Sequence, residues 1–311
     1  MGLDPARFVD GTVREIRRVV GDEKALAACS GGVDSTVAAV LAKMALGERL
    51  KVVYIDDGFR RYREPEYSLE LLSKAGLSAE LIDAKHEFYK SVAGLSDAEE
   101  KRKAFRHTFY TVLGRAAKSF GARFLVQGTI APDIIETAGG VKTQHNVLTQ
   151  IGLDPRVYGF EVVEPLRELF KPQVREVARY LGLPKEISER MPFPGPGLLI
   201  RVVGETTPEK VEVVRQATRI IEEETSGLNA FQTFAVLLPG RATGLKEGKR
   251  VYGYILAVRV VKSADAMTAE ACEIPYPMLK RIAKRIIEEV PGVSRVLYDV
   301  TDKPPATIEF E

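Results

Sequence analysis

The feature that most constrains this chain is the six-residue segment Ser30-Gly31-Gly32-Val33-Asp34-Ser35, called here the 30–35 loop. It follows the apolar run 25–29, which is typical of a buried strand, and it precedes residues 36–41, whose pattern indicates a helix. Two glycines allow a sharp turn that brings backbone N–H groups close to an anion. The serines add hydroxyl donors, and the helix N-terminus adds unpaired N–H groups and a positive dipole end. The segment therefore predicts a phosphate-binding loop between a strand and a helix.

A turn of small residues between a strand and a helix also occurs without a ligand, so the bound phosphate needs a second argument. Asp34 supplies it, because a carboxylate inside an anion site is explained when a divalent metal accompanies the phosphate. The Walker A pattern is absent, since no Gly-Lys-Ser/Thr follows four residues after a first glycine. The loop thus indicates an ATP-using enzyme with Mg²⁺ at Asp34 and a phosphate chemistry different from that of Walker-type proteins.

The first part of the chain alternates short apolar runs with longer amphipathic ones. The patterns predict strands at 25–29, 51–56, 79–83 and 123–127 and helices at 5–20, 64–75 and 97–119. This order is typical of an α/β fold whose parallel sheet has helices on both faces. Ligands bind beyond the carboxyl ends of such strands, so we expect the 30–35 loop, Asp57 and Gly128 to converge there.

A second region begins after a stretch rich in proline and glycine. Residues 192–197 contain three prolines and two glycines among six positions, which excludes regular helix or a central strand. The stretch is either a linker or a shaped loop at a domain boundary, and Phe193 with the stiff prolines favours the loop. Beyond it the patterns predict helices at 208–225 and 277–290 and strands at 233–238, 251–261, 295–300 and 307–310. We expect a smaller α+β domain at 189–311 after a larger one at 1–188.

Charge, hydropathy and cysteine content exclude several classes of protein. The 45 basic and 43 acidic residues give a net charge of only +2, which does not favour a nucleic-acid partner. No apolar segment is long enough to span a membrane, and no secretory signal is visible, so a cytoplasmic location is expected. Cys29 and Cys272 are too few for a disulfide framework or a cysteine-rich zinc site. Cys29, at a strand end, is better explained as a buried residue than as a nucleophile.

The 30–35 loop resembles the PP-loop of the N-type ATP pyrophosphatases, which cleave ATP between the α and β phosphates. Further segments at 128–136, 141–147, 164–171, 192–197 and 303–311 resemble successive motifs of the GMP synthetases, in order and over essentially the whole chain. We expect NAD synthetases and tRNA thiolases to share only the PP-loop with this chain. The resemblance implies an ATP pyrophosphatase domain followed by a dimerisation domain that also binds XMP.

The activity that this resemblance implies is ATP-dependent adenylation of XMP, followed by amination with ammonia to give GMP, AMP and pyrophosphate. It implies a lid at 137–150, where Lys142 neutralises the phosphates and His145 is a donor or proton shuttle, with Asp133 and Glu136 orienting the lid and the reacting groups. It further implies two binding sets. The ATP and pyrophosphate set is Ser30, Gly31, Gly32, Val33, Asp34, Ser35, Asp57 and Gly128, and the XMP set is Arg190, Gln232, Arg295, Lys303, Ile308 and Glu309.

Each of these roles has a plain structural alternative. Lys142 is also compatible with a surface lysine beside two glycines, and His145 with a structural histidine. Asp133 and Glu136, one helical turn apart, are also compatible with helix capping. The 303–311 segment is compatible with an edge strand as well as with phosphate and ribose contacts.

The sequence departs from the family pattern at two positions: Ala131 replaces a frequent tyrosine before the lid, and Gln144 replaces the first of two histidines within it. A glutaminase His-x-Glu pattern is absent, because His86, His107 and His145 are followed two positions later by Phe88, Phe109 and Val147. We therefore expect a separate glutaminase subunit to supply ammonia, and a homodimer through the second domain. Two other functions remain open: another PP-loop ligase, for instance one acting on tRNA, and a nucleotide-binding regulator without turnover.

Overall fold

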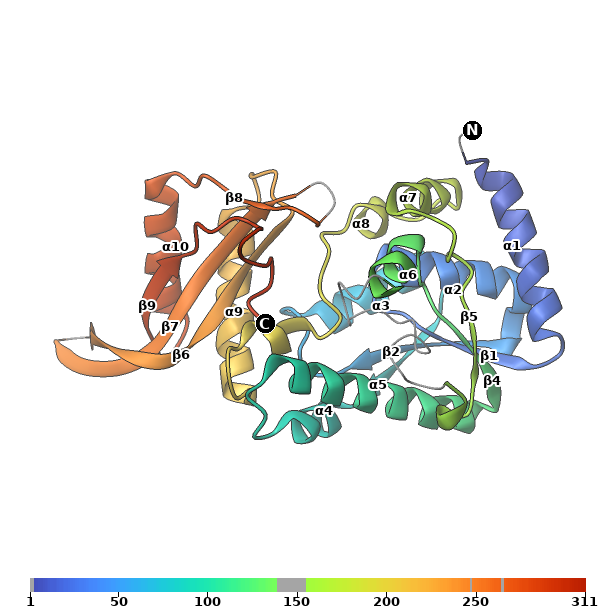
Figure 1. The fold of residues 1–311 in the computed structure, drawn as a ribbon, viewed down its shortest axis with the longest axis horizontal. Coiled ribbons are helices and arrows are strands. Elements are labelled where there is room, and N and C mark those ends of the chain that lie inside the picture. Colours follow the sequence, from blue (N-terminus) through green and yellow to red (C-terminus); the bar gives the residue numbers. More distant parts are fainter. Residues whose placement is uncertain (1–2, 139–154, 247, 264–265) are drawn as a thin grey trace. The chain divides into compact units, whose positions relative to one another are not determined.

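The computed structural model describes residues 3–138, 155–246, 248–263 and 266–311 (Figure 1). The chain forms two compact units. Unit 1 comprises Met1–Asp56, Glu64–Ala84 and His107–Arg190, and unit 2 comprises Asp57–Arg63, Lys85–Arg106 and Met191–Glu311. Two short segments from the first part of the chain therefore pack with its later part.

Unit 1 is built on a five-stranded sheet in the order β3-β2-β1-β4-β5, in which every neighbouring pair is parallel. The central strand β1 pairs Ala25 with Leu50 of β2 on one side and with Phe124 of β4 on the other. Both faces of β1 are buried, which explains its continuous apolar sequence. The strands are β1 Lys24–Ala28, β2 Leu50–Asp56, β3 Ala79–Asp83, β4 Ala122–Val126 and β5 Glu161–Val163.

Helices cover the sheet of unit 1 on both faces, with α2 on one side and the later part of α5 on the other (Figure 1). The first helix shows why the pattern is helical: Asp4 caps it by accepting a hydrogen bond from the Arg7 N–H, and Val9, Val13 and Ile16 form one buried face. The helices are α1 Pro5–Val20, α2 Val33–Leu46, α3 Glu64–Lys74, α5 Ala98–Phe120, α6 Ala131–Ala138, α7 Lys171–Tyr180 and α8 Lys185–Ser188, with 3₁₀ turns η1 Gly47–Arg49 and η2 Pro155–Tyr158.

Unit 2 is centred on a long antiparallel hairpin of β6 and β7, extended at one edge of β7 by antiparallel β8 and parallel β9. The helices α9 and α10 pack against this sheet and against each other. The hydrophobic cluster beside β6 contains Phe234, Val236 and Ile308. The elements are α4 Lys85–Val92, η3 Gly197–Arg201, α9 Pro208–Glu224, β6 Gln232–Lys246, β7 Lys249–Lys262, β8 Glu270–Ala271, α10 Tyr276–Glu289 and β9 Val293–Tyr298, together with the first turns of α5.

The α/β class and the four predicted strands of the parallel sheet are confirmed. The prediction of a strand at 307–310 was wrong, because these residues pair with no strand. Their positions depend on side chains instead: Ile308 enters the hydrophobic cluster and the Arg201 guanidinium binds the Glu309 carboxylate. The three-residue strand β5 was not predicted, because so short a segment has no measurable alternation.

Candidate functional site

The 30–35 loop lies at the carboxyl end of β1 and leads directly into α2. Gly31 has a φ of +75°, in the left-handed region, and Gly32 is the N-cap residue of α2 without a side-chain capping bond. The Ser35 hydroxyl donates to the Gly32 carbonyl at 3.2 Å and lies 3.3 Å from the Ser30 hydroxyl. Val33 is buried in the core. The loop thus leaves the N–H groups of the first turn of α2 without a side-chain cap, as an anion site requires.

Two glycines in this region are required by close contacts. A Cβ atom on Gly128 would lie 2.7 Å from the backbone of Asp34 and Ser35, and one on Gly31 would lie 2.9 Å from Cβ of Ser68. The segment after β4 therefore touches the first turn of α2 backbone to backbone. This contact agrees with the expected convergence of Gly128 and the 30–35 loop at one edge of the sheet.

Asp34 has one paired and one unpaired carboxylate oxygen. Its Oδ2 accepts from Nζ of Lys171 at 2.5 Å, while its Oδ1 is buried without a hydrogen-bond partner in the described structure. Burial raises the pKa of Asp34, and the nearby Asp133 charge adds to the increase, whereas Lys171 opposes it. A buried, unpaired carboxylate oxygen beside a phosphate-binding loop fits Mg²⁺, which takes one or two carboxylates and completes its shell with phosphates and water. Within the described residues no cluster of three or more acidic, histidine or cysteine side chains could hold a metal.

Asp133 lies in the first turn of α6, where its Oδ2 accepts a hydrogen bond from the Ile130 N–H at 2.9 Å. This is the capping role that the sequence left open, and its charge still acts on Asp34. Glu136 belongs to the same helix. The Glu136 side chain, Lys142 and His145 lie outside the described residues.

Sequence reasoning did not single out Lys171 and Arg175 as site residues. Lys171 begins α7, and Arg175 lies about one turn later on the same helix. Both cations lower the pKa of Asp34 and oppose the effect of burial. The segment 164–171, which resembles a family motif, contained the only signal for Lys171.

Arg190 is connected to the 30–35 loop. Its Nη2 donates to Oε1 of Glu64 at 2.7 Å, and its Nη1 donates to the Ser68 hydroxyl at 3.3 Å and to the Ser30 carbonyl at 3.5 Å. Only 12% of the Arg190 side chain and 6% of the Glu64 side chain are exposed. Within unit 1, this buried ion pair therefore supports the loop from the side of α3.

Cys29 precedes the loop and is buried at 2% exposure. Its thiol donates to the Ser35 carbonyl at 3.4 Å, and burial raises its pKa to about 12. A thiol in this state is not a nucleophile at neutral pH. The structure therefore agrees with the expectation that Cys29 has a packing role.

The other five residues predicted for XMP lie in unit 2. Gln232 and Glu309 both contact the buried Arg201, whose Nη2 donates to Oε1 of Gln232 at 3.4 Å and whose Nε donates to Oε2 of Glu309 at 2.9 Å. Arg201 also stacks on Phe234, with 3.9 Å from its guanidinium carbon to the ring centroid. Arg201 was not predicted from the sequence. The remaining members lie elsewhere in the unit: Ile308 in the core, Arg295 exposed on β9, and Lys303 with its Nζ 2.8 Å from the Ala266 carbonyl.

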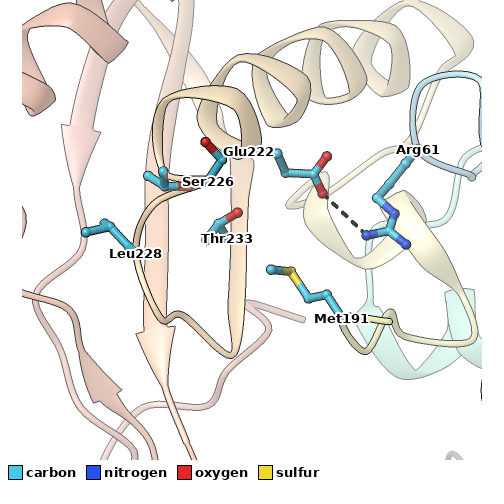
Figure 2. Close-up of a pocket in the computed structure, with 7 residues that line it drawn as sticks. Arg61, Met191, Glu222, Ser226, Leu228 and Thr233 are labelled. Carbon is cyan, nitrogen blue, oxygen red and sulfur yellow. Dashed lines mark hydrogen bonds and ion pairs between the residues drawn. The ribbon is translucent and has the colours of Figure 1, made fainter. Parts of the chain in front are cut away.

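A pocket of about 210 Å³ opens in unit 2 beside Thr233 (Figure 2). Nη1 of Arg61 lies 3.4 Å from Oε1 of Glu222 across it, and the Arg61 guanidinium lies 4.7 Å from the Phe193 ring centroid. The Thr233 hydroxyl is buried without a hydrogen-bond partner in the described structure. The pocket thus combines a cation, a carboxylate and hydroxyls. Its lining residues are Arg61, Met191, Glu222, Thr225, Ser226, Leu228 and Thr233.

Asp57, predicted to face the nucleotide, has an almost fully buried carboxylate in unit 2. Its Oδ1 accepts from the Phe59 N–H at 2.8 Å and its Oδ2 accepts from Nε of Arg60 at 2.9 Å. Both oxygens therefore have internal partners.

Residues 219–310 match the model of the GMP synthase C terminal domain, and residues 7–110 match that of NAD synthase. The expectation that NAD synthetases share only the PP-loop with this chain was therefore wrong, because the match extends well beyond the 30–35 loop. One subunit of the glutamine-hydrolyzing GMP synthase of Archaeoglobus fulgidus is 55% identical over 310 residues, which cover 99% of this chain and all of that protein. The corresponding subunits from Methanopyrus kandleri and Pyrococcus horikoshii are 52% and 50% identical, again over 99% of this chain and all of theirs. Among solved structures, the NMN synthetase of Francisella tularensis is 21% identical, with a TM-score of 0.49 over 63% of this chain and 78% of that one. No described helix is long and apolar enough to cross a membrane.

Proposed function

Because this chain belongs to the family of these GMP synthase subunits, we propose that it converts XMP to GMP with ATP and ammonia. The xanthine O2 attacks the α-phosphorus of ATP and pyrophosphate leaves. Ammonia then attacks C2 of the adenylated base, and AMP leaves with the original O2. The products are GMP, AMP and pyrophosphate, so the protein is a ligase that forms a C–N bond.

The observation that carries this proposal is the geometry of the 30–35 loop with Asp34. N–H groups at the start of α2 and the hydroxyls of Ser30 and Ser35 are suited to bind the pyrophosphate as it leaves. Gly128 allows the segment after β4 to approach the backbone of Asp34 and Ser35 closely. The remaining members of the proposed ATP set are Gly31, Gly32, Val33 and Asp57, although the internal bonds of Asp57 favour a role in shaping its own turn.

Mg²⁺ would be held at Asp34, where it would offset the negative charge of the phosphates. Lys171 contributes the second charge at this position: 41% of its side chain is exposed, so its ammonium can reach an anion bound in the loop. Lys142 would neutralise the phosphates from the lid at 137–150, with His145 as donor or proton shuttle. Asp133 and Glu136 would orient the lid and the reacting groups. These four residues remain predictions from the family resemblance.

XMP would bind in the second domain, for which we propose the range 189–311 after an ATP pyrophosphatase domain at 1–188. Lys303 and Arg295 supply cations for the 5′-phosphate, and Ile308 and Glu309 supply backbone and ribose contacts. Gln232 remains a prediction for the base or the phosphate, and its Oε1 accepts a hydrogen bond from the buried Arg201 in this structure. The assignment of Arg190 to XMP stays a prediction, and its contacts with Ser30 and Ser68 favour a role at the 30–35 loop.

The ammonia source would be a separate glutaminase subunit, since each of these relatives is described as one subunit of a glutamine-hydrolyzing synthase. A homodimer through the second domain and a cytoplasmic location complete the proposal.

The test is to incubate the purified chain with ATP, Mg²⁺, XMP and an ammonium salt, omitting each in turn, while following GMP and pyrophosphate. GMP that requires all four components supports the proposal. Pyrophosphate without GMP would point to a PP-loop ligase with another acceptor. No turnover with ammonium present, even after addition of the glutaminase subunit, would favour a nucleotide-binding regulator.

A further inference from the structure

A lysine in unit 2 carries its charge in a fully buried position. Lys101 lies in the first turn of α5, and its side chain has no exposed surface. Its Nζ forms an ion pair with Oε2 of Glu311 and donates to the carbonyl oxygens of Val202 at 2.8 Å and Gly204 at 3.0 Å. Burial lowers the pKa of Lys101, whereas Glu311 opposes this change by favouring the charged form. The three N–H groups of the ammonium have acceptors in the Glu311 carboxylate and the two carbonyl oxygens. A buried charge is tolerated in a protein only when it is paired and hydrogen-bonded in this way.

Glu311 is held by more than this lysine. Its Oε1 accepts from the Gly204 N–H at 2.9 Å, and its backbone carbonyl accepts from Nη2 of Arg102. Only 8% of the Glu311 side chain is exposed. Two neighbouring residues of α5, Lys101 and Arg102, therefore anchor one residue that lies more than 200 positions later in the chain.

The anchor matters because residues 308–311 have no strand to hold them. Without ladder hydrogen bonds, the segment depends on side-chain contacts: Ile308 in the hydrophobic cluster, Glu309 on Arg201, and Glu311 on Lys101. Two of these three residues, Ile308 and Glu309, are those proposed to contact XMP. A small shift of the segment would displace both from the nucleotide, and misplacement of about 1 Å can reduce activity a hundredfold.

We propose that Lys101 is a positioning residue for XMP: through its ion pair with Glu311 it holds residues 308–311 in the conformation that places Ile308 and Glu309 against the nucleotide. This inference rests on the proposed function. Lys101 itself does not touch XMP or the reacting atoms in this scheme.

The test compares Lys101→Met, Glu311→Gln and the double variant with Lys103→Met, a control on the same helix whose lysine is exposed. Two quantities are measured: amide hydrogen exchange of the 303–311 segment, and the KM values for XMP and ATP in ammonia-dependent GMP formation. We expect each single variant to exchange faster in this segment and to raise the KM for XMP about tenfold or more, with the KM for ATP within about twofold of the original. The double variant should be no worse than the poorer single one, because the two residues act as one pair.

Hydrogen exchange gives a result even if the catalytic proposal fails. Should the unaltered protein make no GMP, the proposed function is wrong, and unchanged exchange in Lys101→Met would show separately that the anchor is wrong. Faster exchange with an unchanged KM for XMP would overturn the positioning role. An equal loss toward ATP and XMP would indicate a general structural role instead. If Lys101→Met does not fold, the same two measurements on Glu311→Gln test the positioning role, because glutamine has nearly the shape of glutamate.

Discussion

Nζ of Lys171 lies 2.5 Å from Oδ2 of Asp34, although 137 positions separate the two residues in the chain. The contact joins the first residue of α7 to the first turn of α2. It places a cation at the position where the proposed reaction needs one, beside the N–H groups that start α2. One Asp34 oxygen accepts from Lys171, and the other has no hydrogen-bond partner in the described structure. The carboxylate can therefore hold a metal ion while the lysine binds the phosphate that accompanies it.

Removal of the Lys171 charge should slow the chemical step in which pyrophosphate leaves the α-phosphorus of ATP. We expect Lys171→Met to reduce kcat/KM about a hundredfold, because the loss of one charge-stabilising donor typically has an effect of this size. Lys171→Arg, which keeps the charge, should recover part of the loss. Pyrophosphate formation is the measurement, and the exposed Lys185→Met on α8 is the control. Equal activity of Lys171→Met and Lys185→Met would show that the ion pair with Asp34 is only structural.

Replacement of Asp34 by asparagine should weaken the use of Mg²⁺. The amide keeps the size of the side chain and can still accept from Lys171, but it removes the negative charge that would bind a metal and pair with the Lys171 ammonium. We expect GMP formation to fall by about two to three orders of magnitude and to require more Mg²⁺. Titration of activity with Mg²⁺ measures this, with the exposed Asp22→Asn as the matched control. An unaltered Mg²⁺ requirement in Asp34→Asn would remove Asp34 from the metal site.

An added methyl group at Gly128 should displace the 30–35 loop. The new Cβ would lie 2.7 Å from the backbone of Asp34 and Ser35, so the start of α2 must shift. We expect Gly128→Ala to raise the KM for ATP and lower kcat, with about a hundredfold loss of kcat/KM. Gly11→Ala is the control, because no atom lies within 4 Å of its Cβ and alanine favours helix α1. If both variants retain full activity, the close contact at Gly128 has no functional role.

Loss of Arg190 should destabilise the protein and weaken ATP binding in particular. Removal of one partner from a buried ion pair costs about 3–5 kcal/mol, because the buried Glu64 carboxylate would lose the charge of the Arg190 guanidinium. We expect Arg190→Met to lower the free energy of unfolding by that amount in urea titrations, and the folded variant to have a raised KM for ATP. Arg190→Met with Glu64→Gln should recover part of the stability. A raised KM for XMP alone would instead support the assignment of Arg190 to the XMP set.

Ion pairs between α9 and α10 should make unit 2 sensitive to acid. Arg285 binds Glu223, Glu224 and Glu289, and hydrogen bonds from Arg285 lower the pKa of each carboxyl. Carboxyls with lowered folded-state pKa values stabilise the fold above their unfolded pKa of about 4.3, and that contribution is lost as the pH falls through the lower folded-state values.

We therefore expect Arg285→Ala to lower the Tm by a few degrees at pH 7 and to differ little from the original protein at low pH. Thermal unfolding measured from pH 7 to pH 3 tests this, with Lys280→Ala, an exposed residue on α10, as the control. A Tm difference that stays constant with pH would contradict the proposed origin of the effect.

The local elements of unit 1 were predictable from short segments. Apolar runs, helical spacing and the glycines of the 30–35 loop act over a few residues, and they predicted the parallel sheet and the loop at the end of β1. The 303–311 segment shows the limit of this reasoning. Its apolar residues alternate as in a strand, yet Ile308 and Glu309 are held by the hydrophobic cluster and by Arg201.

The sequence by itself determined the α/β class, the anion-binding loop and the family, because these depend on local backbone preference and on motifs that can be read in order. Only the tertiary structure decided which charged side chains meet: Lys171 with Asp34, Arg190 with Glu64, and Lys101 with Glu311. These partners are 137, 126 and 210 positions apart. Such pairs depend on strand order, helix packing and burial. Charged residues occur throughout the chain, and the sequence around each of them does not identify the partner that it will bind.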